Sequence, residues 1–118
     1  MIELTYNAKI AVLRILSDIL NADGIVHEKE VKYFDEIVES FELPDHYKHD
    51  LDNCGALQAL SVVRVLPAEV KADITKLMGR MIIVDENIHY NEVKLYNTVC
   101  EACNIKNGFD FDDPFLSI

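Results

Sequence analysis

Apolar residues recur every three or four positions along two long stretches of the chain, and this spacing predicts amphipathic helices. The first stretch runs from about residue 4 to residue 22, and the second from Pro67 to about Val84. Polar residues form only a narrow stripe on the first stretch, so we expect that helix to be mostly buried. The predicted inner faces carry Val12, Ile15, Leu16 and Ile19 in the first helix, and Val70, Ile74, Leu77, Met78, Met81 and Ile82 in the second.

A polar loop and a further helix follow each of these stretches. Gly24 is predicted to end the first helix, because glycine reaches the left-handed C-cap conformation without steric cost. The next helix begins near His27 or Glu28 and ends before Pro44, and a matching helix follows the second loop. Two short helices are predicted between the pairs, at about 46–53 and 56–65, and Pro67 is predicted to be the first helical residue of the second long helix.

The two helix-loop-helix segments match each other at a constant offset of 62 residues. The Asp, His, Glu, Val and Lys of segment 23–32 fall in register with the same residue types in segment 85–94, and apolar positions on both sides pair at the same offset. We therefore predict an all-α, single-domain helical bundle built from two pseudo-symmetric helix-loop-helix repeats, with both loops on the same side.

The 118 residues suffice for one hydrophobic core, so we predict a helical domain over 1–108 and a tail over 109–118. The tail alternates aromatic and acidic residues, which leaves self-packing, disorder or docking on a neighbour as alternatives. Three cysteines form no paired framework and favour a reducing compartment. Cys100 and Cys103 pair in the repeat with the inner-face residues Val38 and Phe41, so we predict buried, inert thiols rather than a redox or zinc pair.

The formal charge of -10 argues against nucleic acid or an anionic membrane surface as a partner, because both need clustered Lys and Arg. It favours cations or basic protein surfaces, and we expect a protein partner. The chain shows neither the pattern of a signal peptide nor an apolar run of the ~20 residues needed to span a bilayer. We therefore expect a cytoplasmic protein that does not insert into membranes.

Each loop offers Asp, His and Glu at positions i, i+4 and i+7. These residues predict a divalent cation held between the loops. Hard cations such as calcium or magnesium take oxygen ligands, whereas manganese or zinc is favoured if histidines participate. Four converging carboxylates would repel one another unless they were protonated or bridged by metal. The candidate ligands are Asp23, Glu30, Asp85 and Glu92, joined by His27 and His89 if imidazoles take part.

Helix capping is the alternative explanation of the two glutamates. If His27 and His89 are N-caps, Glu30 and Glu92 stand at the third helical position, where a carboxylate can reach back to the N-cap amide. Histidine is not a favoured N-cap, however, and capping does not require the aspartate before it. An EF-hand is not expected, because counting back places apolar side chains such as Met81 where oxygen ligands are needed.

The segment Asn21-Ala22-Asp23-Gly24-Ile25-Val26-His27-Glu28-Lys29-Glu30, which ends a buried helix and is repeated in the second half, resembles the TerB-like family associated with tellurite resistance. The resemblance covers roughly residues 4 to 105. It implies a compact bundle with two pseudo-symmetric halves, acidic metal-binding loops, and a non-catalytic role in stress-related or membrane-associated complexes. It assigns the metal to Asp23, Glu30, Asp85 and Glu92. The second loop has Glu86-Asn87 where the family prefers Asp-Gly, so equal metal affinity of the two loops is not expected.

The function expected from sequence is therefore a TerB-like, non-catalytic helical module that binds a divalent cation and works in stress response or in resistance to tellurite or other toxic anions. Two alternatives come from other classes. In the first, a metal-free interaction module recruits a protein through its acidic surface or its aromatic tail. In the second, a metal-dependent enzyme holds a metal-bound water in an open cleft.

Overall fold

The computed structural model describes residues 3–84 and 86–106, which form six helices and no strand. The predicted all-α fold is thus confirmed. Asp85 and the predicted tail at 109–118 lie outside the described residues. The helices are α1 (Tyr6–Leu20), α2 (Glu28–Ser40), α3 (Tyr47–Asp52), α4 (Ala56–Arg64), α5 (Ala68–Ile83) and α6 (Tyr90–Ala102).

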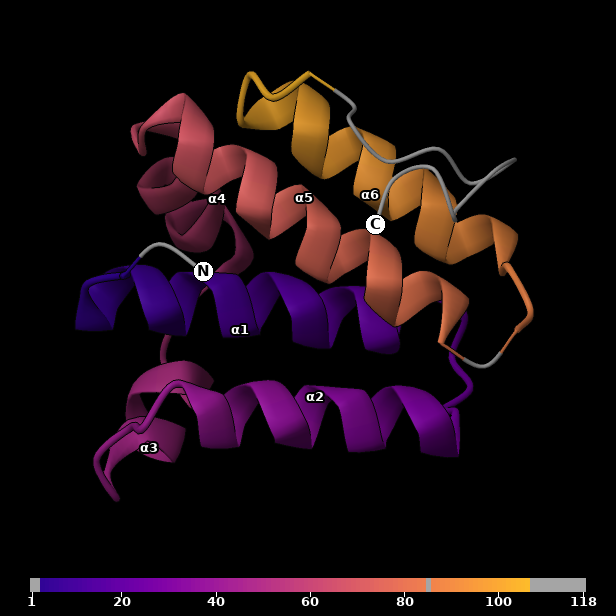
Figure 1. Ribbon diagram of the computed structural model, residues 1–118, viewed down its shortest axis with the longest axis horizontal. Helices are drawn as coiled ribbons and strands as arrows, with labels where there is room; N and C mark the ends of the chain where they lie inside the picture. Colours follow the sequence, from indigo (N-terminus) through magenta and orange to yellow (C-terminus); the bar gives the residue numbers. More distant parts are fainter. Residues whose placement is uncertain (1–2, 85, 107–118) are drawn as a thin grey trace.

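Helix α1 lies at the centre of the bundle and contacts each of the other five described helices (Figure 1). It begins after Thr5, whose hydroxyl accepts a hydrogen bond of 3.2 Å from the amide of Ala8. Such a cap satisfies one of the unpaired amides of the first turn. Nine of its fifteen residues are buried, which fits the narrow polar stripe in the sequence. Each fully buried Leu or Ile contributes roughly 1.5–3 kcal/mol of hydrophobic stabilisation.

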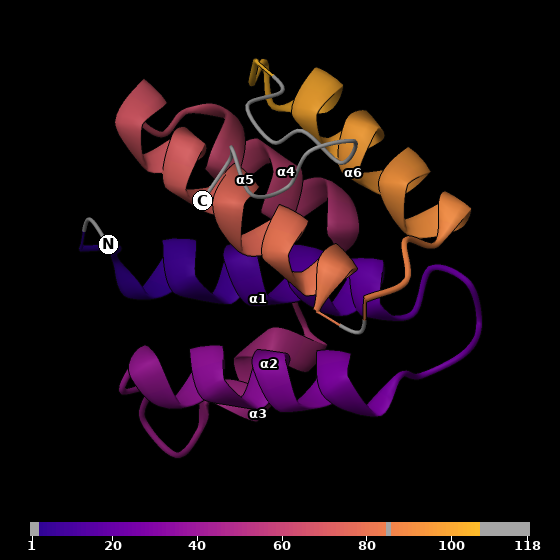
Figure 2. The same ribbon diagram turned by 45° about the vertical axis from the view of Figure 1, so that its right-hand side comes forward.

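The remaining helices lie on two sides of α1. Figures 1 and 2 both show α2 and α3 on one side and α5 and α6 on the other. The loop between α1 and α2 and the loop between α5 and α6 lie at the same end of the bundle, as predicted. The ring centroids of His27 and His89, one from each loop, are 4.1 Å apart.

Two predicted helix boundaries are wrong by a few residues. Pro67 is the N-cap of α5 rather than its first helical residue, because its ψ of 151° is extended while its φ of -58° is ordinary for proline. Helix α1 ends at Leu20, before Gly24, and Asn21 is its C-cap. The side chain of Asn21 donates a hydrogen bond to the carbonyl of Ser17. Gly24 does adopt a left-handed conformation, with φ of 76°, but it does so within the loop.

The three cysteines are buried and unbridged, as the inner-face positions of Cys100 and Cys103 predicted. Burial raises the pKa of all three thiols, so the unreactive protonated form dominates at neutral pH. The thiol of Cys103 lies 3.6 Å from the carbonyl oxygen of Leu60, and the side chain therefore fills space between α6 and α4. Separately, none of the helices in the described part of the chain is long and apolar enough to cross a membrane.

Candidate metal centre

The two loop histidines begin equivalent helices. His27 is the N-cap of α2, with φ of -95° and ψ of 128°, and His89 is the N-cap of α6, with φ of -96° and ψ of 127°. Neither side chain makes a capping hydrogen bond. Capping by the imidazoles therefore does not account for the placement of these residues.

The imidazole rings of His27 and His89 stack on each other. Their centroids are 4.1 Å apart and their planes differ by 14°. Both side chains are shielded, with 21% and 25% of their surface exposed. A metal ion binds an imidazole through an uncharged ring nitrogen.

Asp23 faces both rings from near the start of the first loop. Its Oδ2 lies 3.0 Å from Nε2 of His27 and 3.7 Å from Nδ1 of His89. Its Oδ1 accepts a hydrogen bond of 3.0 Å from the backbone amide of Ile25, which fixes the carboxylate in an Asx-type turn. The pKa of Asp23 is lowered, chiefly by its hydrogen bond with His27. The hydrogen bond from the Ile25 amide and the nearby imidazoles of His27 and His89 also lower this pKa, whereas partial burial raises it.

The spacing of these three groups fits a transition-metal ion. One donor atom each from Asp23, His27 and His89 can be chosen so that all lie within 4.8 Å of one another. In a tetrahedral zinc site with bonds of about 2.0 Å, neighbouring ligand atoms are about 3.3 Å apart. The observed separations of 3.0 Å and 3.7 Å lie on either side of that value. To bind one ion between the loops, the two stacked rings would have to turn so that a nitrogen of each points at it.

Glu30 and Glu92 stand at the third positions of α2 and α6, and both are completely buried. Burying a carboxylate costs free energy unless it is hydrogen-bonded, paired or bound to metal, although the positive end of the helix dipole offsets part of that cost. The same positions are those that a capping box requires. Within the described residues, the close group of metal-ligand atoms comprises Asp23, His27 and His89, and the glutamates lie outside it.

The structure thus brings together three of the six residues predicted as ligands, and these include both histidines. Asp85 lies outside the described residues. The four-carboxylate form of the site is therefore not what the described residues display. Instead, a carboxylate and one imidazole of the first loop meet an imidazole of the second.

Sequence reasoning missed the exposed apolar side chains in and beside these loops. Ile25 and Val26 are 61% and 58% exposed in the first loop, and Ile88 is 48% exposed in the second. Tyr90, the first residue of α6, is 77% exposed. The signal in the sequence was the occurrence of large apolar residues at loop positions where no helical face exists to bury them.

Comparison with known protein families and with curated proteins finds no match to this chain. Among solved structures, the chain is similar to a protein of unknown function from Porphyromonas gingivalis W83, with a TM-score of 0.76 and 18% sequence identity. The similarity covers 90% of this chain and 83% of that chain. At this level of identity the likeness establishes a shared fold and says nothing of a shared activity.

Proposed function

We propose that this chain is a TerB-like, non-catalytic helical module that binds a divalent cation between its two loops. The observation that carries the proposal is the approach of Asp23, His27 and His89 to one another, with all three donor atoms within 4.8 Å. The role in stress response, including resistance to tellurite or other toxic anions, rests on the resemblance of segment 21–30 to that family. The expected location is the cytoplasm, and the expected partner is another protein.

The proposal includes two pseudo-symmetric halves, and the backbone supports it. Helices α2 and α6 begin and end at positions that differ by the same 62 residues as the sequence repeat. Four described residues have positive φ, namely three non-glycine residues and Gly24, and they also fall into pairs at this offset. Gly24 and Glu86 have φ of 76° and 67°, and Glu42 and Asn104 have φ of 51° and 56°. Left-handed residues are uncommon, so two matched pairs favour a duplicated unit.

Zinc or manganese is the favoured ion, because two of the three converging donors are imidazole nitrogens. Calcium and magnesium prefer oxygen and would draw on the carboxylates of Asp85, Glu30 and Glu92 instead. The buried glutamates are then either further ligands or helix-capping groups. The choice of ion therefore reports which set of side chains forms the site.

A metal titration of chelator-treated protein tests the proposal. Zinc, manganese, calcium and magnesium are added separately, and the melting temperature is followed by circular dichroism. An ion at one hundred times its dissociation constant should stabilise the folded protein by about 2.7 kcal/mol. If Asp23, His27 and His89 form the site, zinc or manganese should raise the melting temperature of the wild type, and His89→Gln should abolish that rise. His49→Gln is the matched control, because His49 is exposed on α3.

Each result of this titration is informative. A shift with calcium or magnesium alone, unaffected by His89→Gln, would replace the imidazole site by the four-carboxylate site. The absence of a shift with all four ions would rule out the metal-binding proposal and leave helix capping as the explanation of Glu30 and Glu92.

Protein interaction is the second candidate function, and the exposed apolar side chains favour it. Four of the six large apolar residues that are exposed in the described chain are Ile25, Val26, Ile88 and Tyr90, in or next to the two loops. Water-exposed apolar groups that gather at one place are typical of contact surfaces. The partner would be a protein that presents an apolar segment to this end of the bundle, with or without bound metal.

A further inference from the structure

A cavity lies beside the first half of α1, where α3 and α4 meet it. Its volume is about 320 Å³, close to the lower end of the range for small-molecule sites. Eight described residues line it: Tyr6, Asn7, Ile10, Asp50, Asn53, Cys54, Gln58 and Val62. Tyr6 begins α1 and Asp23 follows its end, and a helix of 15 residues is about 22 Å long, so this cavity is separate from the loop histidines.

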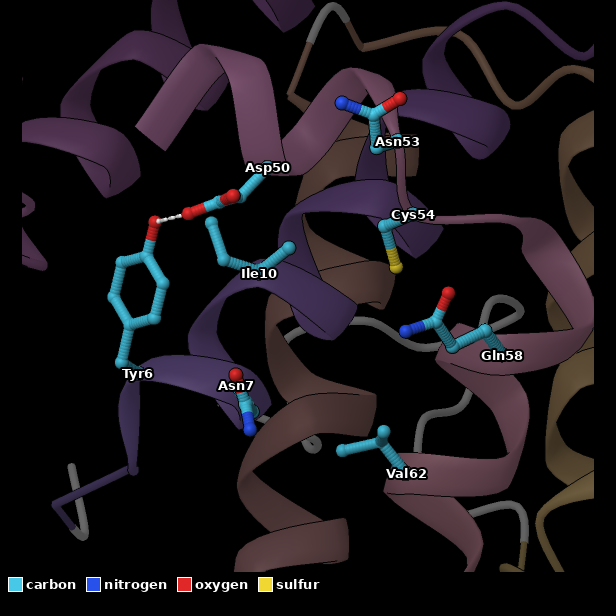
Figure 3. A pocket seen from close by; sticks show the side chains of 8 residues that line it. All are labelled: Tyr6, Asn7, Ile10, Asp50, Asn53, Cys54, Gln58 and Val62. Atoms are coloured by element: carbon cyan, nitrogen blue, oxygen red, sulfur yellow. Dashed lines mark hydrogen bonds between the residues drawn. The ribbon is translucent and has the colours of Figure 1, made fainter. Parts of the chain in front are cut away.

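One wall of the cavity is formed by a hydrogen-bonded pair from distant parts of the sequence. The hydroxyl of Tyr6 donates to Oδ2 of Asp50 over 2.5 Å. Figure 3 shows this pair on one side of the cavity and the Cys54 thiol and Gln58 amide on the other. The hydrogen bond to Asp50 is the main cause that raises the pKa of Tyr6 to about 12, so the phenol stays uncharged and keeps donating. The carboxylate of Asp50 is thereby held at the cavity wall.

The chemistry of the lining selects for a cation. Asp50 is the one charged side chain among the eight, and no Lys or Arg lines the cavity. Asn53 uses its side-chain N–H in a hydrogen bond of 2.8 Å to the carbonyl of His49, which leaves its amide oxygen to accept. The amides of Asn7 and Gln58 supply two further oxygen acceptors. Burial raises the pKa of Cys54, so its thiol adds no charge.

The same lining also suits an alkyl group. The methyl groups of Ile10 and Val62 and the ring of Tyr6 provide apolar contacts within the cavity. An aromatic ring additionally attracts a cation placed over its face. The net charge of -10 raises the local concentration of cations around the whole molecule.

We propose that this cavity binds a small primary alkylammonium ion, whose three N–H donors are shared between the Asp50 carboxylate and the neighbouring amide oxygens. The alkyl chain of the ligand lies against Ile10 and Val62. The same chemistry is offered by a free amine and by a lysine side chain of another protein.

Binding of n-butylammonium to the full chain tests the proposal directly. The measurement is a titration followed by NMR chemical shifts at pH 8, above the range in which histidine side chains ordinarily carry charge. We expect a dissociation constant in the roughly millimolar range, as usual for a ligand of this size. Butyrate, which is anionic, should not bind, and the neutral 1-butanol should bind at least about tenfold more weakly. A capped lysine, titrated in parallel, shows whether a free amine or a lysine side chain binds more tightly.

Two substitutions identify the site. Asp50→Asn should weaken binding of n-butylammonium about tenfold, because a hydrogen bond to a charged group is replaced by a neutral one. Asp52→Asn is the matched control, since it removes the same charge from the same helix at an exposed position that does not line the cavity, and affinity should stay within about twofold. Gln58→Lys places a competing ammonium in the cavity at an exposed position and should abolish binding without disturbing the fold.

The proposal is overturned by any of three results. The first is the lack of binding by n-butylammonium to the wild-type chain. The second is equal binding of n-butylammonium and butyrate, which would mean that charge does not select the ligand. The third is unchanged affinity in Gln58→Lys or in a folded Asp50→Asn protein. None of these results depends on a metal ion between the loops.

Discussion

The ring of His27 stacks on the ring of His89 at a centroid distance of 4.1 Å, although the two residues are 62 positions apart in the chain. Each ring stands at the start of its own helix, and the loop before it follows α1 or α5, the two described helices with the most buried residues. Neither α1 with α2 nor α5 with α6 can form this contact alone. The site between the loops therefore depends on the packing of both pairs.

Removing single carboxylates should separate a metal site from a capping role. Asp23→Asn should weaken zinc or manganese binding by at least about tenfold, because one of three converging donors loses its charge. Glu92→Gln should also weaken it if Glu92 is a ligand, whereas a capping box tolerates glutamine. Both proteins should keep a nearly unchanged helical circular dichroism spectrum. Isothermal titration calorimetry gives the affinities, with Glu28→Gln as the control at an exposed first-turn position of α2.

Metal binding as tight in Asp23→Asn as in the wild type would remove Asp23 from the site. If Glu92→Gln alone has no effect, the imidazole site stands and Glu92 is assigned to capping.

The stability contributed by Asp23 should depend on pH in a defined direction. The pKa of Asp23 is lowered in the folded chain, chiefly by its hydrogen bond with His27. Its contribution is therefore fully present above the pKa of an ordinary aspartate, about 3.9, and is lost as the pH falls through the lowered value. Metal-free wild-type protein should melt higher than Asp23→Asn near pH 6, and the two melting temperatures should converge as the pH falls through the lowered pKa of Asp23. A constant difference across this range would contradict the assignment.

Two substitutions in the loops test backbone strain. Glu86 has φ of 67°, and this left-handed region costs a non-glycine residue roughly 1–2 kcal/mol. Glycine avoids that cost but loses more chain entropy on folding. Glu86→Gly should therefore raise the free energy of unfolding by about 0.5–1 kcal/mol. Gly24→Ala should lower it by about 1 kcal/mol. No atom lies within 4 Å of an added Cβ at Gly24, so its effect would come from the backbone alone. Urea denaturation measures both changes, and effects of the opposite sign would contradict the left-handed geometry.

The cysteines should react as core residues. Cys100 and Cys103 are 4% and 0% exposed, so thiol reagents should label them only at the rate of unfolding. Cys103→Ala should cost about 1 kcal/mol by leaving a small cavity between α6 and α4. Labelling in native buffer and in urea, together with denaturation of the variant, checks both statements. Rapid labelling of the native protein would show that these thiols are accessible.

Much of the fold follows from periodic patterns that the sequence displays openly. The apolar spacing on both sides of the two loops is sufficient to predict α1, α2, α5 and α6, and pairing Cys103 with Phe41 predicts its burial. The N-cap positions of His27 and His89 follow in the same way. These predictions succeed because local spacing and the repeat constrain the same residues twice.

The rest depends on contacts that leave no local pattern. Tyr6 and Asp50 pair across 44 positions, and nothing in the spacing of either helix indicates that pairing. Glu30 and Glu92 are polar residues at helix starts, which ordinarily remain exposed, so their complete burial was not predicted. The stacking of the two imidazoles is likewise set by how the loops pack. Sequence reasoning identified the candidate ligands but not which of them meet.

The central position of α1 has a consequence for synthesis on the ribosome. This helix leaves the ribosome first among the six, yet its contacts include α5 and α6, the last two to be made. At about 5 to 20 residues per second, the 82 residues between the ends of α1 and α6 take roughly 4 to 16 s to translate. During that time part of the apolar surface of α1 has no native partner to cover it. We therefore expect the nascent chain to need protection by a chaperone until α6 has emerged.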